Sequence, residues 1–360
     1  MIRDGCSELL ARSGATQPAS RLRQRLSIVT FHRVLSEEDR RRYPLPGLAV
    51  TPQELDEHLR FLTRHFECTT LSHAVGRWKR RETGDRPLLA ITFDDGQRDN
   101  YVNALPVLER HGTKASFFVT SGTLEDTRPL WHDALALLIC RLQASNAQNG
   151  DSANRVSRSK ELLAEVMHEP PAALLAGQWT IETAVENTKR WSAEQRSDWM
   201  ERAAKLLPTA PAEPWEGFMG VQELKHLLTL GHEVGSHSHS HALLPQCDEA
   251  TLHLEIAGSR QRLEQALQAP VHTFCYPNGS VDSRCVDHVT RAGYLAAVTT
   301  QWGSNTSHQH PALLRRFDMN ARHAADRHGR FSEARLAWRM SGLHPGLSSQ
   351  GDDLYARASV

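Results

Sequence analysis

The sequence predicts an α/β fold with a mainly parallel sheet, and three observations carry this prediction. Short apolar runs rich in β-branched and aromatic residues alternate with amphipathic helical patterns, as they do where helices cover a parallel sheet. The runs are mainly apolar, which is typical of strands buried on both faces. The chain is 360 residues long, and this length favours a sheet closed into a barrel-like single domain.

Each expected element has its own signal in the chain. The strands are short apolar runs at residues 27–31, 88–93, 115–119, 233–236, 272–276 and 294–299. Between the first two strands, Thr51 is a suitable N-cap for a helix over residues 52–65, in which three leucines share one face. Between the fourth and fifth strands, one apolar stripe predicts a helix over residues 248–267.

Residues 131–216 interrupt this alternation. They are polar and helical in pattern and contain no convincing strand. We therefore expect a helical insertion within a catalytic domain at residues 26–347, with an N-terminal extension at residues 1–25 and a frayed tail at residues 348–360. The insertion is either a lid or wall of a substrate cleft or a solvated helical excursion, and the sequence favours neither.

Composition excludes several classes of protein. The 39% hydrophobic content is that of a globular chain and not of a disordered or coiled-coil one. Basic and acidic residues balance at 42 each, so we expect no nucleic-acid partner. The six cysteines are scattered without a CxxC pair, which favours reduced thiols. Because neither a signal-peptide core nor a membrane-spanning run is visible, we expect a cytoplasmic protein, in solution or peripheral at the inner membrane.

The strongest local signal is a pair of adjacent carboxylates, Asp94 and Asp95, at the end of the strand at residues 88–93. Gly96 follows and lets the chain turn, so that both carboxylates can face one cleft. Two such groups titrate differently when one is tied to a metal, which favours one ligand and one proton acceptor. The same residues would also form an ordinary turn whose aspartates cap the next helix.

Histidine and serine alternate after the strand at residues 233–236. Twenty histidines in 360 residues give about one His-x-x-x-His pair by chance, so the spacing alone is weak evidence. The position at a strand end strengthens it, because imidazole is a common zinc ligand and an open zinc site needs three protein ligands. His237, His241 and one of Asp94 or Asp95 would supply them.

A third signal is the turn at Tyr276, Pro277 and Gly279, which follows the strand at residues 272–276. By itself it indicates only a turn. The first strand also ends in a polar residue, His32. Because the carboxyl ends of parallel strands share one edge, where the active sites of α/β folds lie, we expect these four clusters to converge there.

Taken together, the motifs resemble those of the polysaccharide deacetylases of carbohydrate esterase family four. The resemblance rests on residues 92–96, on His237-Ser238-x-Ser240-His241 and on Phe274-x-Tyr276-Pro277-x-Gly279. Residues 30–34 and 131–133 are similar to those of a bacterial branch linked to exopolysaccharide loci. The resemblance extends from about residue 25 to about residue 320 and is weakest through the insertion.

The resemblance implies a distorted (β/α) barrel, one divalent metal and hydrolysis of N-acetyl groups on amino-sugar chains. Zinc is the usual metal, with Co²⁺, Ni²⁺ and Mn²⁺ as alternatives. By position, Asp95, His237 and His241 would hold the metal, and Asp94 would be the general base. Substrate and oxyanion contacts would come from a further set of residues: Tyr276 with its neighbouring backbone, Pro277 and Trp131.

Two departures from the family pattern shape the remaining predictions. The family has an arginine two residues before the proline of the third motif, where this chain has Cys275. We expect Arg316, with Arg315 as second choice, to reach in from a later strand and orient Asp94. The family's Leu-x-His, which supplies the acid, is also missing after residue 299. His32 is the first candidate for that acid, and a packed structural histidine is the alternative.

We therefore expect a metal-dependent hydrolase that removes N-acetyl groups from the amino sugars of a polysaccharide or glycan precursor. Two alternatives stay open. One is a deformylase or O-deacetylase acting on lipid-linked sugars, since the same chemistry serves any small acyl group. The other is a catalytically silent glycan-binding homologue, which the two departures favour and the intact Asp and His motifs oppose. The expected partner is an acetylated glycan, and an association with polysaccharide assembly proteins is left open.

Overall fold

The structure is a computed structural model that describes residues 2–82, 84–147, 153–167, 180–209 and 211–344. It divides into two compact units. The first, the barrel unit, comprises Met1–Arg40, Gly47–Asp126 and Phe218–Val360. The second, the helical unit, comprises Arg41–Pro46 and Thr127–Gly217.

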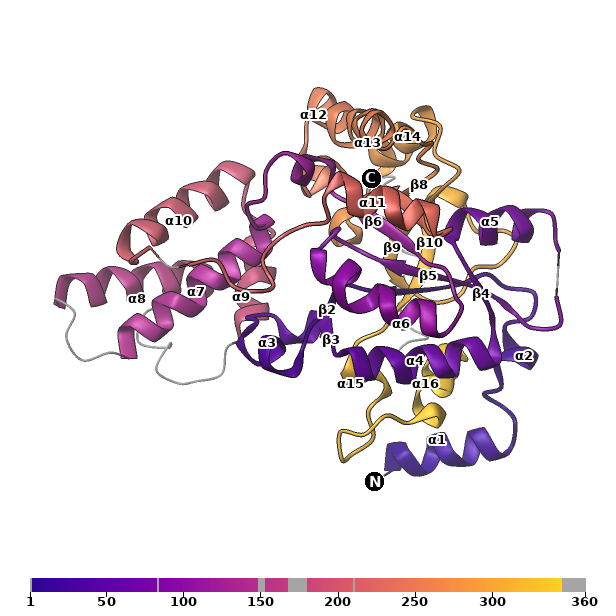
Figure 1. Cartoon of the computed structure of the whole chain (residues 1–360). Coiled ribbons are helices and arrows are strands. Elements are labelled where there is room, and N and C mark those ends of the chain that lie inside the picture. Colours follow the sequence, from indigo (N-terminus) through magenta and orange to yellow (C-terminus); the bar gives the residue numbers. More distant parts are fainter. Residues whose placement is uncertain (1, 83, 148–152, 168–179, 210, 345–360) are drawn as a thin grey trace. The chain divides into compact units, whose positions relative to one another are not determined.

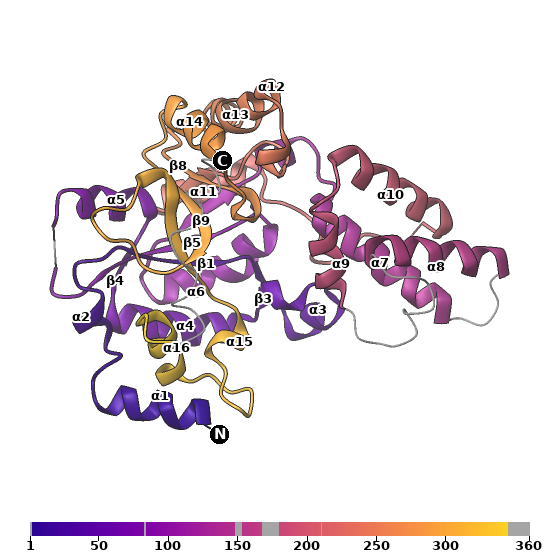
Figure 2. The same ribbon diagram turned by 180° about the vertical axis from the view of Figure 1, so that it is seen from behind.

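The barrel unit is built on a closed ring of parallel strands, with helices packed around it (Figures 1 and 2). In the described residues the ring runs in the order β1, β10, β9, β8, β7, β6, β5, and it closes because β1 pairs with both β10 and β5. The strands are β1 Ser27–Phe31, β5 Leu88–Phe93, β6 Ser116–Val119, β7 Glu233–Ser236, β8 Thr273–Cys275, β9 Ala296–Trp302 and β10 Leu314–Asp318. The expected (β/α) barrel is confirmed.

Two strands of the main sheet lie outside the six apolar runs of the sequence. The strand β10 has the sequence Leu-Arg-Arg-Phe-Asp, whose charged residues interrupt the apolar pattern expected of a buried strand. Its central Arg316 is only 1% exposed, so a buried guanidinium occupies a place where the pattern calls for an apolar side chain. The other, β4 (Glu67–Thr69), is short and pairs with the first three residues of β5. A separate two-stranded sheet joins β2 (Arg33–Val34) to β3 (Ala49–Val50).

Successive side chains of each strand point to opposite sides of the ring, and this alternation makes two cores. The outer core lies between strands and helices and includes Phe31, Phe93, Phe117, Phe274 and Tyr276. The inner core fills the ring with residues such as Ile28, Ala90, Phe118, Cys275 and Val298. Cys275 and Tyr276 are neighbours in the chain but belong to different cores. The Cys275 side chain therefore lies inside the ring, and the Tyr276 side chain lies between the strands and the helices.

The helices of the barrel unit follow the expected alternation. Pro52–His65 (α4) begins at a capping box made by Thr51 and Glu54, and its leucines are buried. The helix expected over residues 248–267 is interrupted by a π-helical turn, η6 (Leu254–Gly258), between α12 (Glu249–His253) and α13 (Ser259–Leu267). The remaining α-helices of this unit are α1 Ile2–Arg12, α2 Pro18–Arg21, α5 Leu71–Lys79, α6 Leu105–Arg110, α11 Val221–Thr229, α14 Ser283–Arg291, α15 Ala321–Ala324 and α16 Glu333–Met340.

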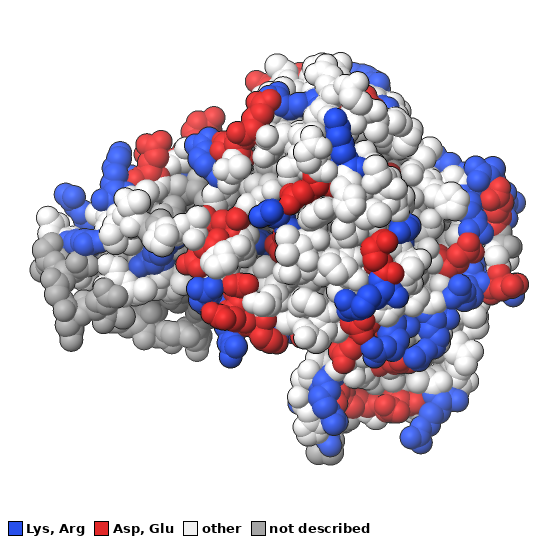
Figure 3. All heavy atoms as spheres, viewed as in Figure 1, with Lys and Arg blue, Asp and Glu red and all other residues white. Residues whose placement is uncertain are grey.

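The segment expected as an N-terminal extension packs on the end of the described chain. Helix α1 lies beside α16 in both views (Figures 1 and 2), and Arg335 of α16 donates to Asp4 of α1 at 3.0 Å. The tail expected at residues 348–360 lies outside the described residues. In the view of Figure 3, basic and acidic side chains are intermixed over the barrel unit, in line with the balanced composition.

The helical unit contains α7 Trp131–Ala147, α8 Ala153–Met167, α9 Ile181–Thr188 and α10 Ala193–Leu206. Its centre is Trp199, which is fully buried and donates its indole N–H to the carbonyl of Leu162 at 3.0 Å. Helix α3 (Glu37–Arg42) runs from the barrel unit into the first segment of this unit. Across both units, the described helices include none with the length and apolar character needed to cross a membrane.

Candidate active site

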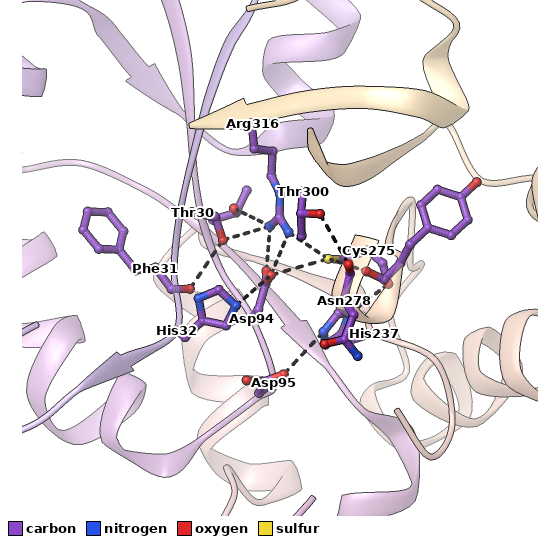
Figure 4. Close-up of polar contacts among 12 residues, drawn as sticks. Thr30, Phe31, His32, Asp94, Asp95, His237, Cys275, Asn278, Thr300 and Arg316 are labelled. Atoms are coloured by element: carbon purple, nitrogen blue, oxygen red, sulfur yellow. Dashed lines mark hydrogen bonds and ion pairs between the residues drawn. The ribbon is translucent and has the colours of Figure 1, made fainter. Parts of the chain in front are cut away.

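Four strands of the ring bring polar side chains to one site. Figure 4 shows Asp94 and Asp95 after β5, with His32 after β1, His237 after β7 and Arg316 on β10. The backbone is bent at Asp95 (φ 72°) and Gly96 (φ 73°), and the Asp94 amide donates to the carbonyl of Phe31 at 3.0 Å. A left-handed conformation is costly for an aspartate, and here it turns the two carboxylates to different neighbours.

Asp95 faces two histidines. Its Oδ1 lies 3.4 Å from the Nε2 of His237 and 3.4 Å from the Nε2 of His241. All three residues are buried, and their donor atoms lie within 4.8 Å of one another. Ligands of a tetrahedral zinc ion, each about 2.0–2.1 Å from it, lie roughly 3.4 Å apart, so this donor set fits a divalent cation.

The orientation of His237 also fits a ligand. Its Nδ1 is 2.8 Å from the carbonyl oxygen of Cys275, so Nδ1 carries the proton and Nε2 offers its lone pair to the same side as Asp95. Burial by itself would lower the pKa of His237, but its contacts with Cys275 and Asp95 hold that pKa well above the usual value. The surroundings of this imidazole therefore favour a positive charge.

Both histidines come from one irregular loop, residues 237–241, which follows β7. Two of its residues have a left-handed backbone, Ser238 (φ 66°) and His241 (φ 59°). The Ser238 hydroxyl accepts the His241 amide at 3.0 Å and closes the turn. Such turns are strained for residues other than glycine, so contacts from outside the loop have to hold it.

Asp94 faces the inside of the barrel and a buried guanidinium. Arg316 donates Nη1 to Oδ1 and Nη2 to Oδ2, both at 2.7 Å, and also holds Thr30 Oγ1 at 2.9 Å. Burial by itself would raise the pKa of Asp94, but the charge and hydrogen bonds of Arg316 lower it to about 2. Arg315, the second choice, lies on the other face of β10, because neighbouring side chains of a strand point to opposite sides.

Cys275 stands where the family pattern has arginine. Its Sγ lies 3.6 Å from Asp94 Oδ2 and accepts a hydrogen bond from Arg316 Nη2 at 3.2 Å. Burial raises the pKa of the thiol, which therefore stays protonated and donates to the carboxylate. A small side chain on β8 leaves the space that the guanidinium of β10 occupies.

His32 lies at the edge of this group. Its Nε2 is 3.7 Å from Asp94 Oδ2, too long for a direct hydrogen bond, and its side chain is 21% exposed. Asn100 donates to the His32 carbonyl at 2.9 Å, and Asp99 accepts the Val34 amide at 2.7 Å. Sequence reasoning missed these two anchors, although the acid-amide pair stands only a few residues after the Asp-Asp-Gly motif.

Tyr276 follows β8. Its amide donates to the carbonyl of Val298 at 3.1 Å, and its ring packs on Phe274 in the outer core. Pro277 has no N–H to offer. An oxyanion contact from the backbone near Tyr276 stays a prediction. A donor that sequence reasoning missed is the residue after Pro277, Asn278, whose Nδ2 is buried without an acceptor among the described residues.

Trp131 begins α7 in the helical unit, where the guanidinium of Arg196 lies 4.8 Å from its ring centroid. Its contact with substrate stays a prediction, as does the role of the whole insertion in shaping a cleft.

Comparison with known proteins identifies relatives of this chain. The family model described as polysaccharide deacetylase matches residues 81–297, more than half of the chain. The putative polysaccharide deacetylase YxkH of Bacillus subtilis (strain 168) is 29% identical over 96 residues, which are 26% of this chain and 32% of that protein. The match therefore spans about a third of the length of this curated relative.

Solved structures share the fold at low sequence identity. The deacetylase PplD of Streptococcus pyogenes, in complex with acetate, aligns with a TM-score of 0.55 and 16% identity over 88% of this chain and 98% of that chain. A de-N-acetylase from Aggregatibacter actinomycetemcomitans aligns with a TM-score of 0.50 and 12% identity over 81% of this chain and 94% of that one.

Proposed function

The chain belongs to the polysaccharide deacetylase family, and on that premise we propose that it is a cation-dependent hydrolase that removes N-acetyl groups from amino sugars of a polysaccharide or glycan precursor. One observation carries the proposal. Two adjacent carboxylates are separated into different roles, Asp95 beside two imidazoles and Asp94 beside a guanidinium. Two solved structures of similar fold, the deacetylase with bound acetate and the de-N-acetylase, support the choice of an acetyl group as the group removed.

In this proposal Asp95, His237 and His241 hold the cation. A bound divalent cation lowers the pKa of a water and polarises an acyl oxygen. Zinc fits the two nitrogens and one carboxylate best, with Co²⁺, Ni²⁺ and Mn²⁺ as alternatives. The fixed Nδ1–H of His237 keeps its Nε2 directed to the same point as Asp95.

Asp94 is the general base. The Arg316 ion pair keeps it ionised and fixes the plane of its carboxylate. With a pKa of about 2 it is a weak base, so the proton it takes has to come from an acidified water. The water oxygen forms a bond to the acyl carbon, the C–N bond breaks, and the amine needs a proton to leave.

His32 is the candidate for that proton donor, because it lies within 3.7 Å of Asp94 and is partly exposed to the solvent side of the site. The cytoplasmic location of the reaction and an association with polysaccharide assembly proteins stay predictions from the sequence.

A direct test measures acetate released from N-acetylglucosamine oligomers by the chelator-treated protein, before and after Zn²⁺ or Co²⁺ is added. We expect release only with added cation. Release from N-formyl or O-acetyl sugars alone would replace the proposal with the deformylase or O-deacetylase alternative. A protein that retains cation and releases nothing from any acylated glycan would overturn the proposal in favour of a silent glycan-binding homologue.

A further inference from the structure

A second buried carboxylate, Glu255, lies beneath the histidine loop and has no part in the chemistry described so far. It belongs to the π-helical turn η6 and is only 2% exposed. Charged side chains are rarely buried this deeply unless several donors surround them. The identity of those donors therefore indicates what the carboxylate does.

Among the described residues, the three donors to Glu255 all belong to the loop at residues 237–241. Its Oε2 accepts the amides of His239 and Ser240, each at 2.9 Å, and its Oε1 accepts the Ser240 hydroxyl at 2.6 Å. These residues lie between the two histidines that face Asp95. One carboxylate thus fixes the backbone that connects them.

The π-helical turn gives Glu255 this position. The carbonyl of Ile256 in the same turn accepts hydroxyl groups of Ser259 at 3.0 Å and Tyr294 at 2.9 Å. Ser259 also contacts Ser236, at the end of β7, with 2.8 Å between their hydroxyl oxygens. The turn is therefore tied to the strand that leads into the loop, and π-helical turns are often found at functional sites.

The loop is held from the other side by the chain after β6. The amides of Ser121 and Gly122 donate to the carbonyls of Ser238 and His239 at 3.0 and 2.8 Å. Ser238 and His241 have left-handed backbones, so the loop needs restraint on both sides. Without Glu255, the amides of His239 and Ser240 would lose their acceptor in a partly buried place, and the loop would relax to satisfy them.

We propose that Glu255 is a positioning residue for the cation site, which sets the relative placement of His237 and His241 by holding the backbone between them. The inference rests on the cation site of the proposed function but not on the substrate. Removing a residue that hydrogen-bonds to metal ligands and orients them typically weakens metal affinity about 10- to 100-fold.

The chain offers a matched control, Glu233. It is also buried and accepts three donors, from Ser72, Ser116 and Thr273, but it stands at the start of β7, at the other end of the barrel. Loss of either carboxylate removes a comparable set of hydrogen bonds. Only one of the two sets belongs to the histidine loop.

The experiment compares the full-length protein with E255A, E255Q and E233Q. Affinity for Co²⁺ is measured by competition with a chelator, and the visible spectrum of the Co²⁺-loaded protein reports ligand geometry. We expect E255A to bind Co²⁺ about 10- to 100-fold more weakly and to shift the spectrum. We expect E255Q, which keeps one oxygen acceptor, to show a smaller change in the same direction, and E233Q to lose thermal stability with unchanged affinity and spectrum.

Equal affinity and an identical spectrum for wild type and E255Q, together with an unchanged E255A, would overturn the inference. So would an equal loss of affinity in E233Q, because the effect would then be general destabilisation. If E255A does not fold, the comparison of E255Q with E233Q decides. Failure of the proposed function is a different result, since wild type would then bind Co²⁺ at this site and release no acetate.

Discussion

The two sides of the site differ although they start from adjacent residues. On the histidine side, Asp95 stands 3.4 Å from two imidazole nitrogens in a strained loop. On the arginine side, Asp94 lies inside a rigid ring of strands with a bidentate guanidinium at 2.7 Å. The first arrangement leaves room for a cation between the donors, and the second already contains its positive charge. One bend at Asp95 and Gly96 therefore gives identical side chains two different sets of partners.

The largest effect is expected on the histidine side. His237→Ala removes one of three ligands, so the protein should lose its cation and its turnover together, by about 10³-fold or more in rate. Metal content after gel filtration and acetate release check this. His239→Ala is the control, because His239 lies in the same loop but outside the group around Asp95. A variant H237A with full metal content would show that the cation is held elsewhere.

Asp94→Asn is expected to separate the effect on metal binding from the effect on turnover. It keeps every proposed ligand and removes the base, so the metal should stay while turnover falls roughly 10²- to 10⁴-fold. Metal content and rate are measured on the same preparation. If D94N lost metal as readily as H237A, the division of roles between the carboxylates would be wrong.

Arg316→Ala is expected to act on Asp94 without touching the metal. Burial would then raise the Asp94 pKa from its value of about 2, so the acid limb of the rate profile should move to higher pH. A pH–rate profile at constant metal content measures the shift, with Arg315→Ala as the control. An unchanged acid limb and near-normal turnover would contradict this role.

The ion pair between Asp94 and Arg316 also predicts that the free energy of unfolding depends on pH. The folded-state pKa of Asp94 is depressed, so its ion pair stabilises the fold fully above the ordinary Asp pKa of about 3.9 and loses this contribution as the pH falls through about 2. Breaking a buried pair costs about 3–5 kcal/mol. The free energy of unfolding of R316A should therefore lie below that of wild type by roughly this amount at pH 6, and the difference should shrink toward pH 2.

A smaller effect is expected at Gly122. A Cβ there would lie 2.6 Å from the carbonyl oxygen of His239, so Gly122→Ala must push the histidine loop away. We expect a several-fold weaker Co²⁺ affinity with little change in the acid limb set by Asp94. Gly5→Ala is the control, because a Cβ at Gly5 meets no atom within 4 Å. Unchanged affinity in G122A would show that the loop tolerates displacement.

The smallest effect on the chemistry is expected from the helical insertion. Replacing residues 131–216 by a short linker should leave both sides of the site intact, so metal content and cleavage of a small activated acetyl compound should persist. Activity on polymeric glycan should fall, because the insertion is predicted to shape the cleft. Equal losses on small and polymeric substrates, in a protein that still folds, would contradict this prediction.

The sequence by itself determined much of the fold and singled out the residues of the proposed site. The bounds of β1, β5 and β7 agree with the predicted strands. Most residues of β1 and β5 are apolar, as is typical of strands buried on both faces. The helix α4 agrees because its N-cap and leucine stripe are local signals. The aspartate and histidine motifs stood out because their residue types carry metal chemistry wherever they occur at strand ends.

Only the tertiary structure decided which partners those residues meet. The strand β10 gives no apolar run because Arg316 carries a charge, and its guanidinium is buried in the barrel because the distant carboxylate of Asp94 pairs with it. Tyr276 packs its ring in the outer core, and this placement depends on closure of the strands into a ring. Glu255 gave no local signal at all, because its three donors lie 15 or 16 residues earlier in the chain and reach it only through the packing of a π-helical turn.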